Sequence, residues 1–220
     1  MNTLKSGTPA MEAYQKVRNA ISQQKLNPGR PLTENYLCES LKLGRSPIRA
    51  ALTQLALDGF VEMPPNRSAR VAQFTQTQVR QIYSLRGMIL SHALDLTIDT
   101  YTEKDIQNLT ACLERQEVAF HHFNFEEYLT AIYDFFFYIV HKANNPYMDE
   151  IAESILKRIN VFLCLYDNFY SVEKLKTLPL HRKMIKAIQQ KKPKAVMQIH
   201  RELCNRILDA YDYMILSNTE

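Results

Sequence analysis

Apolar residues recur at the three- and four-residue spacing of a helix in three short segments at the start of the chain. The segments cover about residues 9–24, 33–41 and 46–58, and each begins beside a threonine, serine or proline of the kind that favours a helix start. Glycine-containing turns separate them. The pattern therefore predicts three short helices in close succession.

Two short apolar runs follow these helices, at residues 60–63 and 69–72. Between them lies the segment 64–68, which reads Pro-Pro-Asn-Arg-Ser and places Arg67 at its tip. Short runs of this kind around a turn predict a two-stranded hairpin. With the three helices, the hairpin would complete a compact first domain over residues 1–74.

From Thr75 onward, the pattern changes to long helices. Thr75-x-x-Gln78 and Thr102-x-x-Asp105 have the spacing of capping boxes, and Asn124 precedes a strongly apolar helix. Further helices are predicted from the turn at 144–146 to about Tyr166, around 181–190, and over 193–216. No strand pattern appears after residue 75, so residues 75–220 are expected to form an all-α antiparallel bundle of about six or seven helices. The predicted fold class is mainly α.

Composition supports a globular protein, since 46% of the residues are hydrophobic and 23% are charged. No apolar run approaches the roughly 18 residues of a membrane span, and the first residues lack the apolar stretch of a signal peptide. We therefore expect a cytoplasmic protein without a membrane partner. The four cysteines, Cys38, Cys112, Cys164 and Cys204, are isolated, which argues against a zinc knuckle or a disulfide framework.

The net charge of +4 is concentrated in the first third of the chain. Residues 1–75 carry ten lysines and arginines against five aspartates and glutamates, whereas the remainder is close to balanced. A polyanion partner is one explanation, and a solvated basic face is the common alternative.

The third predicted helix combines an apolar stripe with an opposite stripe suited to contact DNA. Arg45, Ser46, Arg49 and Thr53 fall on or beside this polar stripe. A helix that enters the major groove needs small or polar residues at its first turns, so that arginines reach guanine edges and phosphates. Arg67 in the hairpin could contact the adjacent backbone or minor groove.

Two arginines alone are more often ordinary solvated residues, so the order of elements carries the argument. The segment LNPGRPLTENYLCESLKLGRSPIRAALTQLALDGFVEMPPNRSARV resembles the winged helix-turn-helix signature of the GntR family over about 60 residues. The resemblance implies that Arg45, Ser46 and Arg49 contact bases and phosphates. Three positions depart from the family pattern, namely Gly44 at the usual Ser or Thr cap, Ser68 at a usual wing glycine, and Asn35 in place of a basic residue.

In the second domain, polar residues interrupt apolar helical stripes at four positions. They are Arg86, Asp134, His181 and His200. Buried polar groups need partners, so we expect these side chains to meet one another or a ligand. A lone histidine on an apolar face is more often a hydrogen-bonded core residue. A buried arginine suits a carboxylate, and Asp with imidazoles suits a divalent transition metal.

Residues 76–216 resemble the FCD sensor domain of the FadR subfamily of GntR regulators. Many such domains bind a metal through one Asp and three His, and small carboxylic acids dock against it. The resemblance assigns Asp134, His181 and His200 as metal ligands, whereas Tyr138 stands where a histidine is expected. The opening helix also has Leu90 where the family has glutamate.

A phenol is a poor metal ligand, because its pKa is about 10. Three ligands plus water could still hold one Zn, Ni or Mn ion, and the sequence leaves both an occupied and an ion-free site open. His141, one turn beyond Tyr138, is a substitute ligand or a surface residue. Without an ion, a polar cavity lined by Arg86, Tyr138, His181 and His200 would remain able to hold an anion.

The sequence favours a DNA-binding transcriptional regulator, with a repressor as the expected kind. A metal-dependent helical-bundle enzyme is the main alternative, but the Glu-x-x-His pairs of di-iron bundles are missing, as are a P-loop and a G-x-G-x-x-G motif. A protein-interaction adaptor is the other alternative, and the arginines of the third helix argue against it.

One winged helix reads only a few base pairs, so a homodimer on a palindromic operator is expected. We expect a small-molecule effector, with a carboxylate as the candidate class, to shift the population between two spacings of the winged helices.

Overall fold

The chain divides into two compact units, Met1–Phe74 and Thr75–Glu220. The computed structural model describes residues 4–166 and 173–217. Among these residues, no helix is long and apolar enough to cross a lipid bilayer.

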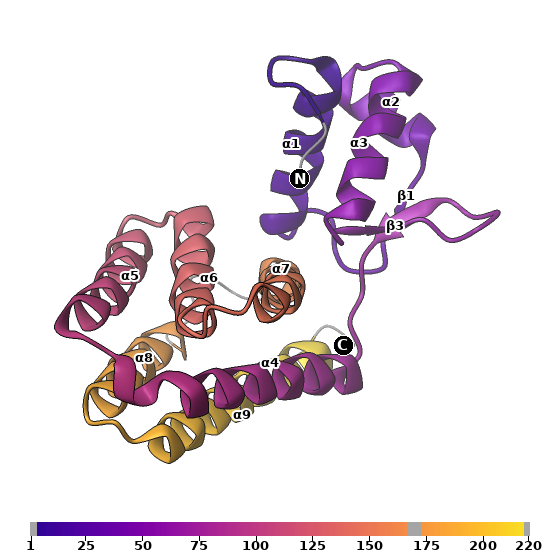
Figure 1. The fold of residues 1–220 in the computed structure, drawn as a ribbon. Helices are drawn as coiled ribbons and strands as arrows, with labels where there is room; N and C mark the ends of the chain where they lie inside the picture. The colour runs from indigo at the N-terminus through magenta and orange to yellow at the C-terminus, as the bar shows by residue number, and fades with distance from the viewer. Residues whose placement is uncertain (1–3, 167–172, 218–220) are drawn as a thin grey trace. The chain divides into compact units, whose positions relative to one another are not determined.

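The first unit packs three helices against a small sheet, in the indigo and purple part of the ribbon (Figure 1). Its elements are α1 (Pro9–Ser22), β1 (Pro31–Leu32), α2 (Glu34–Leu41), α3 (Arg45–Leu57), β2 (Val61–Glu62) and β3 (Ala69–Val71). Helices α1 and α3 pack against each other through fully buried residues such as Ile21, Ile48 and Leu55. Both predicted threonine caps are confirmed, because Thr8 accepts from the amide of Met11 and Thr33 from that of Tyr36.

The sheet has three antiparallel strands in the order β1-β3-β2, whereas the sequence predicted only the hairpin of β2 and β3. The additional strand β1 pairs Leu32 with Ala69. Next to it, the amide of Gly29 donates to the carbonyl of Val71, and the amide of Val71 donates to the carbonyl of Arg30. A two-residue strand that begins with proline has no alternation, so periodicity could not reveal it.

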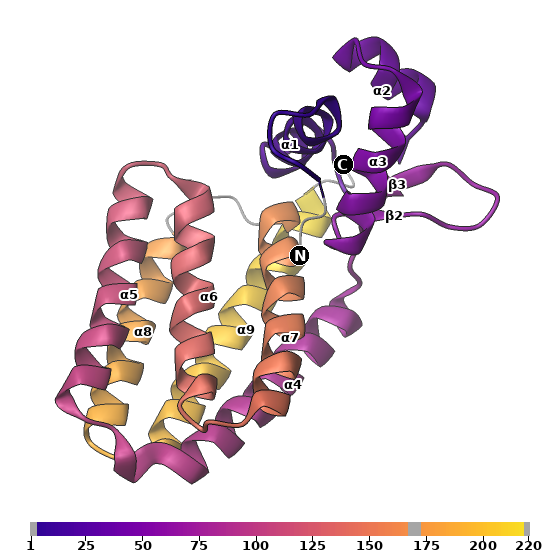
Figure 2. The ribbon, with the colours of Figure 1, turned by 45° about the horizontal axis from the view of Figure 1, so that its top comes forward.

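The second unit is a bundle of long helices (Figure 2). Its elements in the described part of the chain are α4 (Gln76–Thr97), the 3-10 helix η1 (Ile98–Thr100), α5 (Glu103–His121), α6 (Phe125–His141), α7 (Pro146–Tyr166), α8 (Glu173–Gln189) and α9 (Pro193–Ser217). Helix α6 packs between α5 and α7, and α4 lies along α9 in both views. The predicted fold class, a winged helix-turn-helix followed by an all-α bundle, is confirmed.

Both predicted capping boxes are present, at Thr75 with Gln78 and at Thr102 with Asp105. Helix α8 differs from the prediction, because it begins at Glu173 and contains Pro179 in its interior. Proline costs a helix one hydrogen bond, but the neighbouring side chains of Leu178 and Leu180 are buried, and their packing offsets that loss.

Candidate functional site

The predicted DNA-contact residues occupy the exposed face of α3. Arg45, Ser46, Arg49 and Thr53 are all exposed, whereas residues of the opposite face, such as Leu52, are buried. Gly44 is the N-cap of α3 and supplies no side-chain hydrogen bond. The first turn of α3 therefore presents free backbone amides beside two arginines, which suits a phosphate.

Glu34 and Asn35, at the start of α2, accept hydrogen bonds from these arginines. The sequence interpretation did not predict these contacts. Nε of Arg49 donates to Oε1 of Glu34 at 2.6 Å, and Nη2 of Arg45 donates to Oδ1 of Asn35 at 3.3 Å. The hydrogen bond from Arg49 lowers the pKa of Glu34 and raises the pKa of Arg49. Because the Arg49 side chain is 67% exposed, a DNA phosphate can compete for it.

Arg67 lies in the exposed turn between β2 and β3. Its amide donates to the carbonyl of Pro64 at 3.3 Å, and Asn66 adopts a left-handed backbone with φ 58°. Asparagine tolerates this conformation, so Ser68 need not be glycine for the turn to close. The wing therefore presents one exposed cation at its tip.

The predicted effector residue Arg86 is buried in the second unit, with 5% of its surface exposed. Its guanidinium carbon lies 4.1 Å from the ring centroid of Phe136 and 4.6 Å from that of Tyr83. Its Nε donates to Nε2 of His200 at 3.1 Å. Arg86 makes no ion pair with a carboxylate within the described part of the chain. Its guanidinium is therefore surrounded by aromatic rings, an imidazole and the thiol of Cys204.

His181 is buried and also contacts Phe136, with the two rings edge to face at a centroid distance of 5.5 Å. Its Nδ1 lies 2.7 Å from Oε1 of Gln116, whose Nε2 donates to the carbonyl of Ala131. The Gln116 oxygen must therefore accept, so Nδ1 of His181 carries the proton. Its Nε2 has no hydrogen-bond partner among the described residues.

Burial, with the charge of Arg86 as a second cause, lowers the pKa of His181 to about 3. The same causes, joined by His181, lower the pKa of His200 to about 3. Both imidazoles are therefore neutral near pH 7. The positive charge of this cluster at that pH comes from Arg86.

A glycine in α4 allows His200 to approach the helix. A Cβ atom on Gly87 would lie 3.1 Å from Cε1 and 3.4 Å from Nδ1 of His200, closer than ordinary contacts. Glycine in a helix interior costs about 1 kcal/mol relative to alanine. That cost is offset by the position of His200, whose imidazole can then accept from Arg86.

Asp134 does not join this cluster. Its side chain is 38% exposed, and Oδ2 accepts from Nη1 of Arg115 at 2.7 Å. Arg115 also pairs with Glu127. The expectation of a buried Asp134 was wrong, because an arginine one helix away satisfies the carboxylate near the surface.

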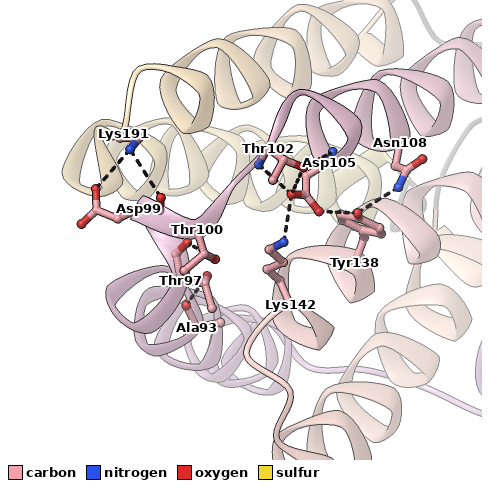
Figure 3. Close-up of polar contacts among 10 residues, drawn as sticks. All are labelled: Ala93, Thr97, Asp99, Thr100, Thr102, Asp105, Asn108, Tyr138, Lys142 and Lys191. Atoms are coloured by element: carbon pink, nitrogen blue, oxygen red, sulfur yellow. Dashed lines mark hydrogen bonds and ion pairs between the residues drawn. The ribbon is translucent and has the colours of Figure 1, made fainter.

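Tyr138 also points elsewhere, into a network between α5 and α6 (Figure 3). Its hydroxyl donates to Oδ1 of Asp105 at 2.8 Å and accepts from Nδ2 of Asn108 at 2.9 Å. Asp105 also binds Nζ of Lys142 at 2.9 Å and caps α5 through Thr102. Tyr138 thus connects two helices at the position where the family pattern has a metal ligand.

The residues that the resemblance assigned to a metal do not fit one together. Asp134 is engaged by Arg115, and Nε2 of His200 accepts from Arg86. The proposed substitute His141 is 61% exposed and pairs with Asp149. In residues 4–166 and 173–217, no group of three His, Cys, Asp or Glu side chains is placed to hold an ion. The structure brings Arg86, His181 and His200 together, without Asp134 or Tyr138.

Replacing Asp105 by asparagine is expected to lower the free energy of unfolding at pH 7 by about 1 to 2 kcal/mol, because a charge-assisted contact to Lys142 is lost. Burial alone would raise the pKa of Asp105, but hydrogen bonds from Lys142, Thr102 and Tyr138 outweigh it and hold the pKa below the ordinary range. Urea unfolding measures the change.

The sign of the pH effect follows from that lowered pKa. Asp105 contributes its stability above the unfolded pKa of about 4 and loses it as the pH falls below that value. The variant should therefore show a shallower loss between pH 4 and pH 2 than the unmodified protein. Asp99→Asn is the control, because that side chain is 84% exposed and its ion pair with Lys191 should contribute little. Equal acid sensitivity of the Asp105 variant would contradict the assignment.

Among the partners that the sequence interpretation missed, Gln116 had a recognisable signal. It follows Leu109 and Leu113 at helical spacing on the buried stripe of α5, so a polar residue there needed an internal partner. Arg115 and Phe136 had no comparable signal, because their roles depend on how α5 and α6 pack.

Two family models match the chain, one in each unit. The model for bacterial regulatory proteins of the gntR family matches residues 9–71. The model for the FCD domain matches residues 81–206, which is more than half of the chain.

Relatives named as HTH-type transcriptional regulators align with much of the chain. YdhC of Bacillus subtilis strain 168 is 25% identical over 190 residues, which is 86% of this chain and 84% of that protein. McbR of Escherichia coli strain K12 is 24% identical over 149 residues, which is 68% of this chain and 67% of that protein. The solved structure of E. coli McbR/YncC superposes with a TM-score of 0.64 at 20% identity and covers 94% of this chain and 98% of its own. At that identity, the likeness shows the fold alone.

Proposed function

This chain belongs to the GntR family of bacterial regulatory proteins and carries an FCD domain, so it is a DNA-binding transcriptional regulator, and we propose that it is a homodimeric repressor released by a small carboxylate. The observation that supports operator reading is the exposed face of α3, where Arg45, Ser46, Arg49 and Thr53 stand free of the core. Arg67 adds a backbone contact from the wing. Because chromosomal DNA is the partner, we place the protein in the cytoplasm.

The small number of base pairs that one winged helix can contact supports a dimer. A single winged helix reads few base pairs, whereas two copies related by a two-fold axis read two half-sites and so gain affinity and selectivity. The operator is therefore proposed to be palindromic, with half-sites about one helical turn apart, or a multiple of that distance.

The effector role is supported by the buried cluster of Arg86, His181 and His200. A buried guanidinium suits a carboxylate, which it can bind through two parallel hydrogen bonds. Ligand binding between the helices would change the relative population of dimer states with different half-site spacing, and only one spacing would fit the operator.

The test begins with selection of bound sequences from random duplex DNA by the full-length protein. An enriched palindrome, bound by two chains in a sedimentation experiment, is the expected result. A single half-site bound by one chain would contradict the dimer. Fluorescence anisotropy with the selected duplex then measures release by a panel of small organic acids, and operator affinity that no acid changes would contradict the effector role.

A further inference from the structure

We propose that the helical unit binds a second segment of duplex DNA by its phosphate backbone, through a basic surface on α8 and α9. Five exposed lysines define this basic surface, namely Lys183, Lys186, Lys191, Lys192 and Lys194. The inference goes beyond the proposed operator reading, which belongs to α3 and the wing, and it requires no effector.

The charge of the second unit is strongly segregated along its sequence. Residues 174–201 contain nine lysines and arginines and no aspartate or glutamate. The other residues of Thr75–Glu220 contain eight basic and eighteen acidic residues. The near-neutral total of this unit is therefore an average over one basic segment and an acidic remainder. A basic segment of this size indicates a surface that binds a polyanion.

The structure places this segment on the outside of two packed helices. Helices α8 and α9 contact each other, and the turn between them carries Lys191 and Lys192. Every exposed residue from Arg182 to Gln198 is a lysine, an arginine or a glutamine. Apolar residues between them, such as Met184, are buried. The exposed side chains are thus all of the kinds that donate to phosphate oxygens in protein–DNA complexes.

Four of the five lysines make no ion pair with the residues that the structure describes. The exception is Lys191, which lies 3.7 Å from Oδ1 of Asp99 (Figure 3). Asp99 is 84% exposed, so this pair contributes little. Lys183 and Lys186 are three residues apart on one helix and repel each other, and a bound polyanion would remove that repulsion.

The composition of the basic surface favours nucleic acid over an acidic protein. Protein–protein interfaces have aromatic and apolar residues at their centre and are depleted in lysine. No large hydrophobic residue is exposed between Thr177 and Ala210, where the structure describes every side chain. Phosphates are bound by charges and amides without such apolar anchors. The surface therefore fits a DNA backbone, bound without sequence preference.

The position of the basic surface favours a second DNA segment over the operator itself. Lys191 contacts Asp99 of η1, which directly follows α4. Helix α4 has 22 residues, so about 33 Å separate its two ends. The turn between α8 and α9 thus lies at the end of α4 that is remote from Thr75, where the chain enters the unit. From there, a regulator on its operator would hold a further stretch of the chromosome.

The experiment measures the capture of a second duplex by the full-length protein. A short operator duplex is immobilised and saturated with protein, and a labelled duplex without operator sequence is added at about 50 mM salt. The labelled duplex should bind, because the winged helices are occupied but the basic surface is not. Its affinity should fall about 100-fold between about 50 and 200 mM salt, as expected for roughly four phosphate contacts.

The variant that tests the basic surface replaces the four lysines without an ion pair, in the changes Lys183→Gln, Lys186→Gln, Lys192→Gln and Lys194→Gln. Capture should fall at least tenfold, whereas affinity for the short operator duplex should stay unchanged. Arginine at the same four positions keeps the charge and should keep capture, which separates lost charge from lost folding.

A matched pair of double variants tests whether the place of the charge matters. Lys192→Gln with Lys194→Gln removes the same charge as Lys157→Gln with Arg158→Gln on the exposed surface of α7. Only the first pair should reduce the slope of log capture affinity against log salt, by about 2. Equal slopes would show that net charge alone attracts the duplex, and would overturn the inference.

The remaining outcomes also overturn the inference and leave operator reading intact. Equal capture by the four-lysine glutamine variant would place the second contact elsewhere. No capture by the unmodified protein would exclude a second segment, and lysines that strengthen operator binding only on a duplex with long flanks would then bind the flank. Poly-glutamate of equal charge that binds this surface more tightly than duplex DNA would identify an acidic protein as the partner.

Discussion

Replacing Arg45 and Arg49 together by alanine is expected to lower operator affinity about 100-fold, because each arginine at a base or phosphate contributes roughly 1 to 3 kcal/mol. Both side chains are exposed at the start of α3, and their contacts within the protein are single hydrogen bonds to Asn35 and Glu34. Removing them leaves the core unchanged. Anisotropy with the selected duplex measures the loss.

The salt dependence of operator affinity is a second measurement on the same variant. Two lost phosphate contacts would reduce the slope of log affinity against log salt by about 2, whereas lost base contacts would relax sequence preference instead. Arg158→Ala together with Lys157→Ala, on the exposed surface of α7, removes the same charge. If this control weakens binding equally, net charge rather than the face of α3 determines affinity.

Phe136→Ala is expected to lower the free energy of unfolding by about 3 to 5 kcal/mol. The ring is 1% exposed and contacts Arg86, His181 and Phe135 at once. Its removal leaves a cavity and also takes an aromatic face away from a buried cation. For a chain of this size, the loss corresponds to a fall in Tm of about 10 °C.

Scanning calorimetry of the full-length protein measures that change. Phe136→Leu fills most of the volume and should lose markedly less stability. Phe123→Ala is the matched control, since that ring is 66% exposed and its truncation should alter stability by less than about 0.5 kcal/mol. Equal stability of Phe136→Ala and the unmodified protein would contradict the central place of this ring in the core.

The sequence was sufficient for features that depend on local chemistry. The threonine caps and both capping boxes are contacts within four residues, so their spacing is visible in the chain. The exposure of Arg49 follows from the buried stripe on the opposite face of its helix. The mainly helical second unit followed from the same periodicity.

The sequence was insufficient where the outcome depends on packing between helices. Asp134 and His181 both interrupt apolar stripes, but one pairs with Arg115 near the surface and the other is buried beside Gln116. Periodicity gives a face of a helix, and it does not say how deep that face lies or which neighbour covers it. The same limit applies to Tyr138, whose partner Asp105 is a capping residue of another helix.

The short strand β1 has a mechanical consequence for the first unit. It ends at Leu32, and the next residue, Thr33, caps α2, while its partner β3 is one side of the wing. The chain continues from β1 directly into α2, and β1 pairs with β3 of the wing. The wing and the helix-turn-helix are therefore connected as one DNA-binding unit. Because this pairing restricts the distance between the wing and α3, we expect operators with an easily deformed backbone to cost the least to bind.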